Sequence, residues 1–204
     1  SKAAADTVKT VSLELGGKSP NLVFDDCDVS AAVARGASFC FNNTGQSCNA
    51  ASRMLVERNA YEQAIEVAAA TAAATTVDLP SKTGNHIGPL VSEAQFNKVQ
   101  ELIQSGIDEG ARLVAGGIGR PEGINRGWFV RPTVFADTTQ DMTIIREEIF
   151  GPVLAIMPFD TEEEAVSLAN DTPYGLAAYI QTGDMNRARR VGAKLRAGMI
   201  QVNG

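Results

Sequence analysis

The sequence predicts one layered α/β domain built around a largely parallel β-sheet. Apolar, strand-like runs alternate with segments that carry helix signals along the 204 residues, and this alternation is typical of parallel sheets covered by helices. Hydrophobic residues make up 44% of the chain, which suffices for one sizeable core. We find no internal repeat and no low-complexity linker that would divide the sequence into two domains.

The predicted strands are short runs of apolar residues. A further extended segment spans Trp128–Phe135, where Pro132 favours an edge strand or a bulge because proline cannot donate to a sheet ladder. The other strands are expected at Asn21–Phe24, Met54–Val56, Arg112–Ala115, Val153–Met157 and Met199–Val202.

Two helices are predicted in the first part of the chain. Asp28 is suited to cap a helix that runs to Asn43 and leads directly into a turn. The alanine-rich residues 61–76 are helical by propensity.

A third helix begins at Ser92, which forms a capping box with Gln95, and Gly110 is a suitable end for it. The glycine-rich residues 116–127 predict a surface loop.

Two more helices are predicted near the C-terminus. Thr161 and Glu164 form a second capping box ahead of an apolar pattern. Asp184 can cap a last helix, which we expect to end near Gly198.

Composition and charge exclude several classes of function. The formal net charge of −6 and the pI of about 4.9 argue against a nucleic-acid partner. No apolar run approaches the length of a membrane span, and the first residues lack the core of a signal peptide, so we expect a cytoplasmic protein with no membrane partner. One histidine and three cysteines without a C-x-x-C pair predict no metal site.

Cys48 is the strongest candidate for a reactive side chain. It ends the polar string NNTGQSC, in which Gly45 permits a sharp bend, whereas Cys40 lies between two phenylalanines in an ordinary core setting. A lone cysteine is more often structural than catalytic, so the thiol by itself leaves both interpretations open.

Two acidic motifs accompany the thiol. Glu14 stands in LELGGKSP, where it is either a general base or a strand-end carboxylate that pairs with Lys18 on the surface. Glu148 stands in EEIFGPV, where it is either a ligand-binding carboxylate or part of an acidic turn before a strand. The GKS string does not complete a P-loop, because Ser12 occupies the position of that motif's first glycine.

Together these strings resemble the catalytic domain of the NAD(P)-dependent aldehyde dehydrogenase superfamily. The resemblance covers nearly the whole chain and implies a three-layer α/β/α catalytic domain over residues 1–204. It implies that Cys48 attacks an aldehyde to form a thiohemiacetal, that hydride then leaves to NAD or NADP, and that Glu14 activates the water that hydrolyses the resulting thioester.

The resemblance also implies contacts with the cofactor. Glu148 would hydrogen-bond the hydroxyls of the nicotinamide ribose, and Phe150 would pack beside the nicotinamide. Gly16 would let the backbone approach a ligand closely. Gln95 and Lys98 resemble a segment that approaches the cofactor ribose, although both are equally well explained as helix-surface residues.

Members of this family are considerably longer. The resemblance therefore implies that the dinucleotide-binding and oligomerisation parts, including an asparagine that completes the oxyanion hole with the cysteine N–H, are largely absent from residues 1–204. We expect this chain alone to be inactive, and the full-length protein to take a small-molecule aldehyde and to form a homodimer or homotetramer.

Two alternatives stay open at this point. A cysteine hydrolase or thioesterase would use Cys48 and Glu14 without a cofactor, and an isolated structural fragment of a dehydrogenase would fold without catalysing anything. Ser47 and Asn49 flank the thiol with small polar groups, which does not select one aldehyde. The residues also do not decide between NAD and NADP.

Overall fold

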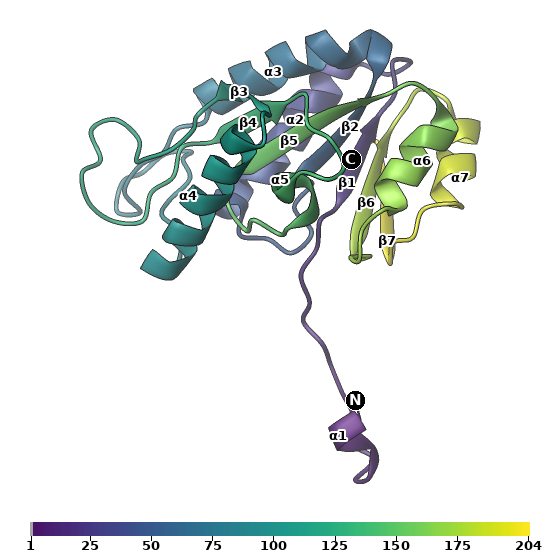
Figure 1. Cartoon of the computed structure of the whole chain (residues 1–204), viewed down its shortest axis with the longest axis horizontal. Helices are drawn as coiled ribbons and strands as arrows, with labels where there is room; N and C mark the ends of the chain where they lie inside the picture. The colour runs from purple at the N-terminus through teal and green to yellow at the C-terminus, as the bar shows by residue number, and fades with distance from the viewer. Residues whose placement is uncertain (1) are drawn as a thin grey trace.

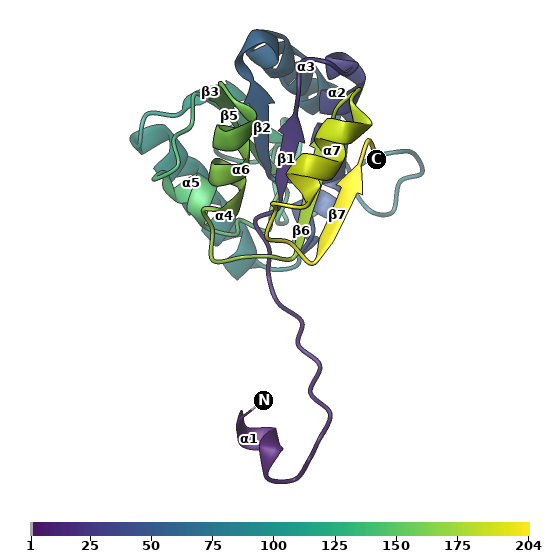
Figure 2. The same cartoon turned by 90° about the vertical axis from the view of Figure 1, so that its right-hand side faces the viewer.

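The computed structural model describes residues 2–204 and shows a seven-stranded sheet with helices on both faces (Figure 1, Figure 2). The strand order is β3-β4-β5-β2-β1-β6-β7. Every neighbouring pair is parallel except β3 with β4, which is antiparallel. The strands are β1 (Pro20–Val23), β2 (Arg53–Glu57), β3 (Arg112–Ala115), β4 (Thr133–Ala136), β5 (Val153–Phe159), β6 (Ala177–Gln181) and β7 (Met199–Val202).

The helices form the two outer layers, which confirms the predicted three-layer architecture. The helices α2 and α3 cover one face of the sheet, whereas α4, α5, α6 and α7 cover the other. Their bounds are α2 (Val29–Phe41), α3 (Tyr61–Ala74), α4 (Glu93–Asp108), α5 (Thr143–Arg146), α6 (Glu162–Asn170) and α7 (Met185–Gly192), and the short helix α1 (Lys2–Ala5) belongs to neither layer.

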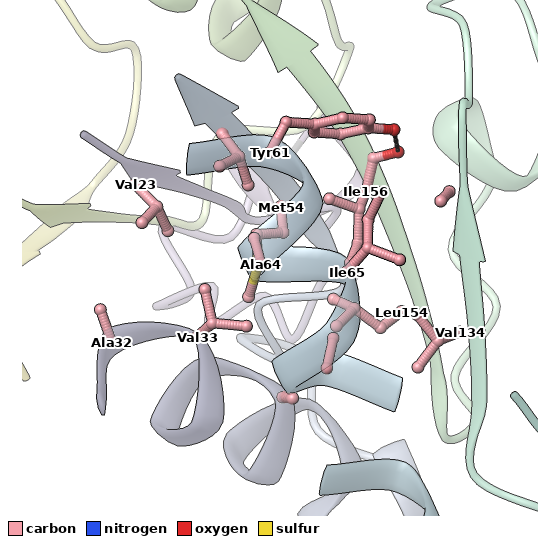
Figure 3. Close-up of a cluster of buried hydrophobic side chains, with 14 of the residues drawn as sticks. Val23, Ala32, Val33, Met54, Tyr61, Ala64, Ile65, Val134, Leu154 and Ile156 are labelled. Carbon is pink, nitrogen blue, oxygen red and sulfur yellow. Dashed lines mark hydrogen bonds between the residues drawn. The ribbon is translucent and has the colours of Figure 1, made fainter. Parts of the chain in front are cut away.

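The core under α2 and α3 shows why these helices pack here. Small and β-branched side chains on the two helices, such as Val33 and Ala64, meet Met54 and Ile156 on the sheet (Figure 3). Tyr61 lies at the end of this cluster, where its hydroxyl is within hydrogen-bonding distance of the Ile156 carbonyl, at 3.4 Å. Burial of apolar area contributes about 25 cal/mol per Å², so this layer fixes α2 firmly at the point where it leads to Cys48.

Most of the predicted strands are confirmed, with two differences. The strand β6, Ala177–Gln181, was not predicted, because its alanines carry no strand propensity. The extended segment predicted over Trp128–Phe135 is longer than the observed strand, since β4 begins only after Pro132. The predicted edge position is also wrong, because β4 lies inside the sheet between β3 and β5.

The predicted helix starts are confirmed, but the capping boxes are only half formed. The side chains of Asp28, Ser92 and Thr161 each accept a hydrogen bond from the first turn of their helix. Gln95 and Glu164 do not complete the boxes, because their side chains bond to other segments or to Asp160.

The helix that Asp184 caps is shorter than predicted. It ends at Gly192 instead of near Gly198, and the following residues form turns before β7.

The N-terminal residues run away from the sheet before β1 begins, and α1 lies apart from the rest of the fold (Figure 1, Figure 2). Apolar side chains on this stretch are exposed, with Val8 91% and Leu13 62% accessible. Within residues 2–204, no helix has both the length and the apolar character needed to cross a bilayer.

Candidate active site

The candidate site forms where the chain enters three neighbouring parallel strands. The strands β5, β2 and β1 lie side by side, and the segments that carry Glu148, Cys48 and Glu14 come directly before them. Because parallel strands begin at the same edge of a sheet, these distant segments meet in space. Open α/β sheets usually bind ligands at the opposite, carboxyl edge, so the fold rule alone would have misplaced this site.

These segments enclose an open cleft of about 530 Å³. The Cys48 thiol is exposed, and Glu14 lies on the exposed extended segment that leads to β1. Five of the seven predicted site residues line this cleft: Glu14, Gly16, Cys48, Glu148 and Phe150.

The turn before Cys48 has an unusual backbone. After α2 ends, Asn43 and Thr44 both adopt left-handed conformations, with φ of 51° and 57°. A β-branched residue rarely tolerates this region, which costs about 1–2 kcal/mol. The buried Thr44 is held there because its hydroxyl donates to the Gly88 carbonyl at 3.1 Å. Gly45 is required because a Cβ at this position would overlap the backbone of Gly151.

The remainder of the turn is held from two further sides. Gln46 accepts a 2.9 Å hydrogen bond from the backbone N–H of Val91, and the Tyr179 hydroxyl donates to the Asn49 carbonyl at 2.9 Å. Sequence reasoning recognised Gln46 only as a polar turn residue, and no sequence signal links it to Val91. The thiol is therefore presented to the cleft by a turn that is fixed at both ends.

Gly16 and Gly17 lie between the cysteine turn and Glu148. The Gly17 N–H donates to Glu148 Oε1 at 3.0 Å. A Cβ on Gly17 would overlap the Cys48 carbonyl oxygen, and a Cβ on Gly16 would overlap the Glu148 carboxylate. Within this chain Gly16 lies against Glu148, and the predicted close approach of its backbone to a ligand stays a prediction.

Gln95 and Lys98 are not among the residues that line the cleft. The Gln95 amide donates to two consecutive carbonyls, those of Ile149 and Phe150, at 2.9 and 2.8 Å. Lys98 donates to the Glu148 carbonyl at 2.8 Å. Phe150 is itself left-handed, with φ of 56°, so α4 holds a strained loop in place. The predicted contact of these two residues with a cofactor stays a prediction.

Lys18 corrects an expectation drawn from the sequence. It does not pair with Glu14 on the surface, because it is only 1% exposed and its ammonium has no hydrogen-bond partner among residues 2–204. Burial lowers the pKa of Lys18 to about 7. The neighbouring Arg53 is also buried, but it donates to the carbonyls of Leu168 and Ala169 at 2.8 and 2.7 Å.

The three cysteines differ sharply in their surroundings. Cys40 is fully buried, and burial raises the pKa of its thiol to about 12. Cys27 is partly buried, and burial likewise raises the pKa of its thiol. Cys48 is the exposed thiol of the three. Over residues 2–204, no cluster of three or more His, Cys, Asp or Glu side chains could hold a metal ion.

Comparison with known proteins agrees with this geometry. The model of the aldehyde dehydrogenase family matches residues 1–204. The chain belongs to the aldehyde dehydrogenase family. It is 48% identical over 204 residues to a 3-succinoylsemialdehyde-pyridine dehydrogenase of a Pseudomonas species, and the match covers all of this chain and 43% of that protein.

Solved structures of the family superpose closely on this fold. An aldehyde dehydrogenase from Bartonella henselae is 58% identical, with a TM-score of 0.96, over all of this chain and 42% of that one. Aldehyde dehydrogenase C from Pseudomonas syringae, a mutant in complex with NAD+ and octanal, is 48% identical with a TM-score of 0.96 and the same coverage. The chain thus spans about two fifths of the length of these relatives.

The accessibility of the thiols predicts their order of reaction. Iodoacetamide should alkylate Cys48 first in the folded protein, because thiolates are the reacting species and both other thiols are disfavoured by burial. Peptide mapping after brief labelling measures this order. Faster labelling of Cys27 or Cys40 than of Cys48 would contradict the assignment.

The close contact at Gly17 predicts that a larger residue at this position destabilises the protein. Gly17→Ala should lower the free energy of unfolding by about 1–3 kcal/mol, because its Cβ meets backbone atoms of Cys48 that cannot move aside freely. Gly88→Ala is the matched control, since its Cβ would meet only Pro80 at an ordinary 3.7 Å. Urea denaturation compares the two variants, and equal stability would show that the contact at Gly17 is not tight.

Proposed function

We propose that the full-length protein oxidises a small aldehyde to a carboxylic acid, with NAD or NADP as electron acceptor, through a covalent intermediate on Cys48. The observation that carries this proposal is that the exposed Cys48 and the two carboxylates of Glu14 and Glu148 line one cleft. Membership of the aldehyde dehydrogenase family supports it.

The first step forms a bond between the Cys48 sulfur and the aldehyde carbon. The carbonyl oxygen becomes an oxyanion, which needs hydrogen-bond donors. The backbone N–H of Cys48 donates to no acceptor in the described residues, so it is available to the oxyanion. A nicotinamide held beside Glu148 and Phe150 would supply the hydride acceptor that this oxidation of the Cys48 thiohemiacetal to a thioester needs.

Glu14 acts in the second half of the reaction. Its carboxylate takes a proton from a water molecule, the water oxygen attacks the thioester carbon, and the C–S bond breaks to release the acid and restore the Cys48 thiolate. Both side chains line the same cleft. Glu14 stands on the extended segment in which Gly17 lies against the cysteine turn and Gly16 lies against Glu148.

The cofactor side of the cleft fits a nicotinamide riboside. Glu148 uses Oε1 to accept from Gly17, whereas Oε2 accepts no hydrogen bond from residues 2–204 and is free for a ribose hydroxyl. Phe150 presents an aromatic side chain to the same cleft. Several solved relatives contain NAD+, so NAD is the first cofactor to test.

We assign residues 1–204 to the thiol-bearing catalytic domain of a longer protein. In this proposal the dinucleotide-binding and oligomerisation parts belong to the remainder, and the full-length protein is a cytoplasmic homodimer or homotetramer. The substrate class is a small-molecule aldehyde, in keeping with the relative that binds octanal.

Replacing the two proposed catalytic residues tests the mechanism. In the full-length protein, Cys48→Ala should abolish aldehyde-dependent NADH formation. Glu14→Gln should leave a rapid burst of NADH but slow steady turnover by roughly 10²–10⁴-fold, because it removes the base needed only for thioester hydrolysis. Stopped-flow absorbance with a panel of aldehydes, and with both NAD and NADP, measures both phases.

A suitable control is Glu122→Gln. This variant changes an exposed carboxylate in the loop of residues 116–127, which contributes no residue to the cleft. Unchanged steady turnover in Glu14→Gln would rule this residue out as the base. Hydrolysis of an activated ester, with no aldehyde oxidation in the presence of either cofactor, would favour a cysteine hydrolase instead.

A further inference from the structure

Lys18 is a buried charge for which the proposed mechanism gives no use. Its side chain is 1% exposed, and its ammonium has no hydrogen-bond partner within residues 2–204. The hydroxyl of the adjacent Ser19 is also buried and also has no hydrogen-bond partner among these residues. Buried ammonium groups are almost always paired, because desolvation without compensation costs several kcal/mol. A methionine would fill similar space without this cost, so the charge is best explained by an effect on the neighbouring site.

The cavity beside Lys18 is too small to hold a ligand. Lys18 and Ser19 line a narrow, partly open space of about 10 Å³, which corresponds to about one water molecule. Because no ligand fits beside Lys18, this side chain can affect the active site only through its charge.

The charge of Lys18 responds to several groups around it. Glu147 and Glu148 favour the ammonium form, whereas Arg53 on β2 opposes it. Cys40 on α2 would favour it only as a thiolate, and burial keeps this thiol protonated near pH 7 because it raises the thiol pKa to about 12. Arg196 lines the same small cavity. Burial outweighs the other effects and brings the pKa of Lys18 to about 7, so the side chain changes charge near neutral pH.

Lys18 is linked to the cofactor side of the cleft through the residue that precedes it, Gly17. Gly17 binds Glu148 directly, and Glu148 is the carboxylate that we place at the nicotinamide ribose. The oxidised nicotinamide ring carries a positive charge, whereas the reduced ring is neutral. A buried ammonium behind Glu148 repels the first form and not the second.

We propose that Lys18 is a specificity-determining residue for the redox state of the cofactor, because its buried positive charge weakens binding of the oxidised form and leaves binding of the reduced form unchanged. This inference rests on the proposed function, since it requires that the nicotinamide lies beside Glu148. A unit charge at about 10–20 Å and an effective dielectric constant of about 20 changes affinity roughly four- to fifteenfold.

Calorimetric titration of the full-length protein with NAD+ and with NADH, from pH 6 to 8.5, tests this inference without an activity assay. In the wild type, the Kd for NAD+ should fall roughly four- to fifteenfold as the pH rises through about 7, whereas the Kd for NADH should not show this step. Lys18→Met should bind NAD+ tightly at every pH. Lys18→Arg, which keeps its charge, should bind NAD+ weakly at every pH.

The outcomes separate the two proposals. If the wild type binds neither NAD(H) nor NADP(H), the proposed function fails and this inference fails with it. If the wild type binds NAD+ but Lys18→Met keeps the same pH dependence, only the role of Lys18 is overturned. Should Lys18→Met not fold, Lys18→Arg decides, because a wild-type pH step in that variant also overturns the role.

The stability of the protein gives an independent check on the charge. The folded-state pKa of Lys18, about 7, lies below its ordinary value of 10.5. Between these values the unfolded chain binds the proton and the folded chain does not, so this group makes the protein more stable as the pH rises. Lys18→Met should therefore gain most over the wild type below pH 7, with the gain lost towards pH 10.5. A gain that is constant across this range would show that Lys18 is not a buried, titrating charge.

Discussion

The space at Gly17 is the constraint on which the rest of the site depends. This residue has room for a hydrogen and nothing larger, because the Cys48 carbonyl lies where a side chain would begin. Its N–H is bound to Glu148. One backbone position therefore fixes the distance between the turn that carries Cys48 and the carboxylate of Glu148. Glu14 lies three residues before this position and Lys18 one residue after it, so both are placed by the same contact.

The surrounding structure stores strain to keep these groups in place. Thr44 and Phe150 adopt left-handed conformations that residues of these types rarely occupy, whereas Asn43 beside Thr44 adopts one that asparagine tolerates. Each belongs to a loop that is held by partners outside it, as when Gln95 on α4 holds the carbonyl of Phe150. Strain of this kind persists only where neighbouring structure over-determines it, and for the loop of Phe150 the helix α4 supplies that structure.

The sequence was most informative where local rules apply. The N-caps at Asp28, Ser92 and Thr161, and most strands, follow from short-range signals that tertiary packing here did not override. The motif strings also identified the residues that line the cleft. What could not be predicted depends on long-range geometry, such as the use of Gln95 to hold a distant loop instead of its own capping box.

The burial of the charged Lys18 could not be predicted from the sequence either. A lysine after two glycines resembles an exposed turn residue, and only the folded sheet buries it among Arg53 and the loop of Glu148. Likewise, nothing in the alanines of Ala177–Gln181 indicates that this strand pairs between β1 and β7.

The bond that we propose between the aldehyde carbon and Cys48 can be detected directly. The most direct test is rapid mixing of the full-length Glu14→Gln protein with an aldehyde substrate and its cofactor, an acid quench within the burst, and mass spectrometry of the peptides. We predict that the peptide containing Cys48 gains the mass of the acyl group. An acyl group on another residue, or turnover with no adduct at any time point, would contradict it.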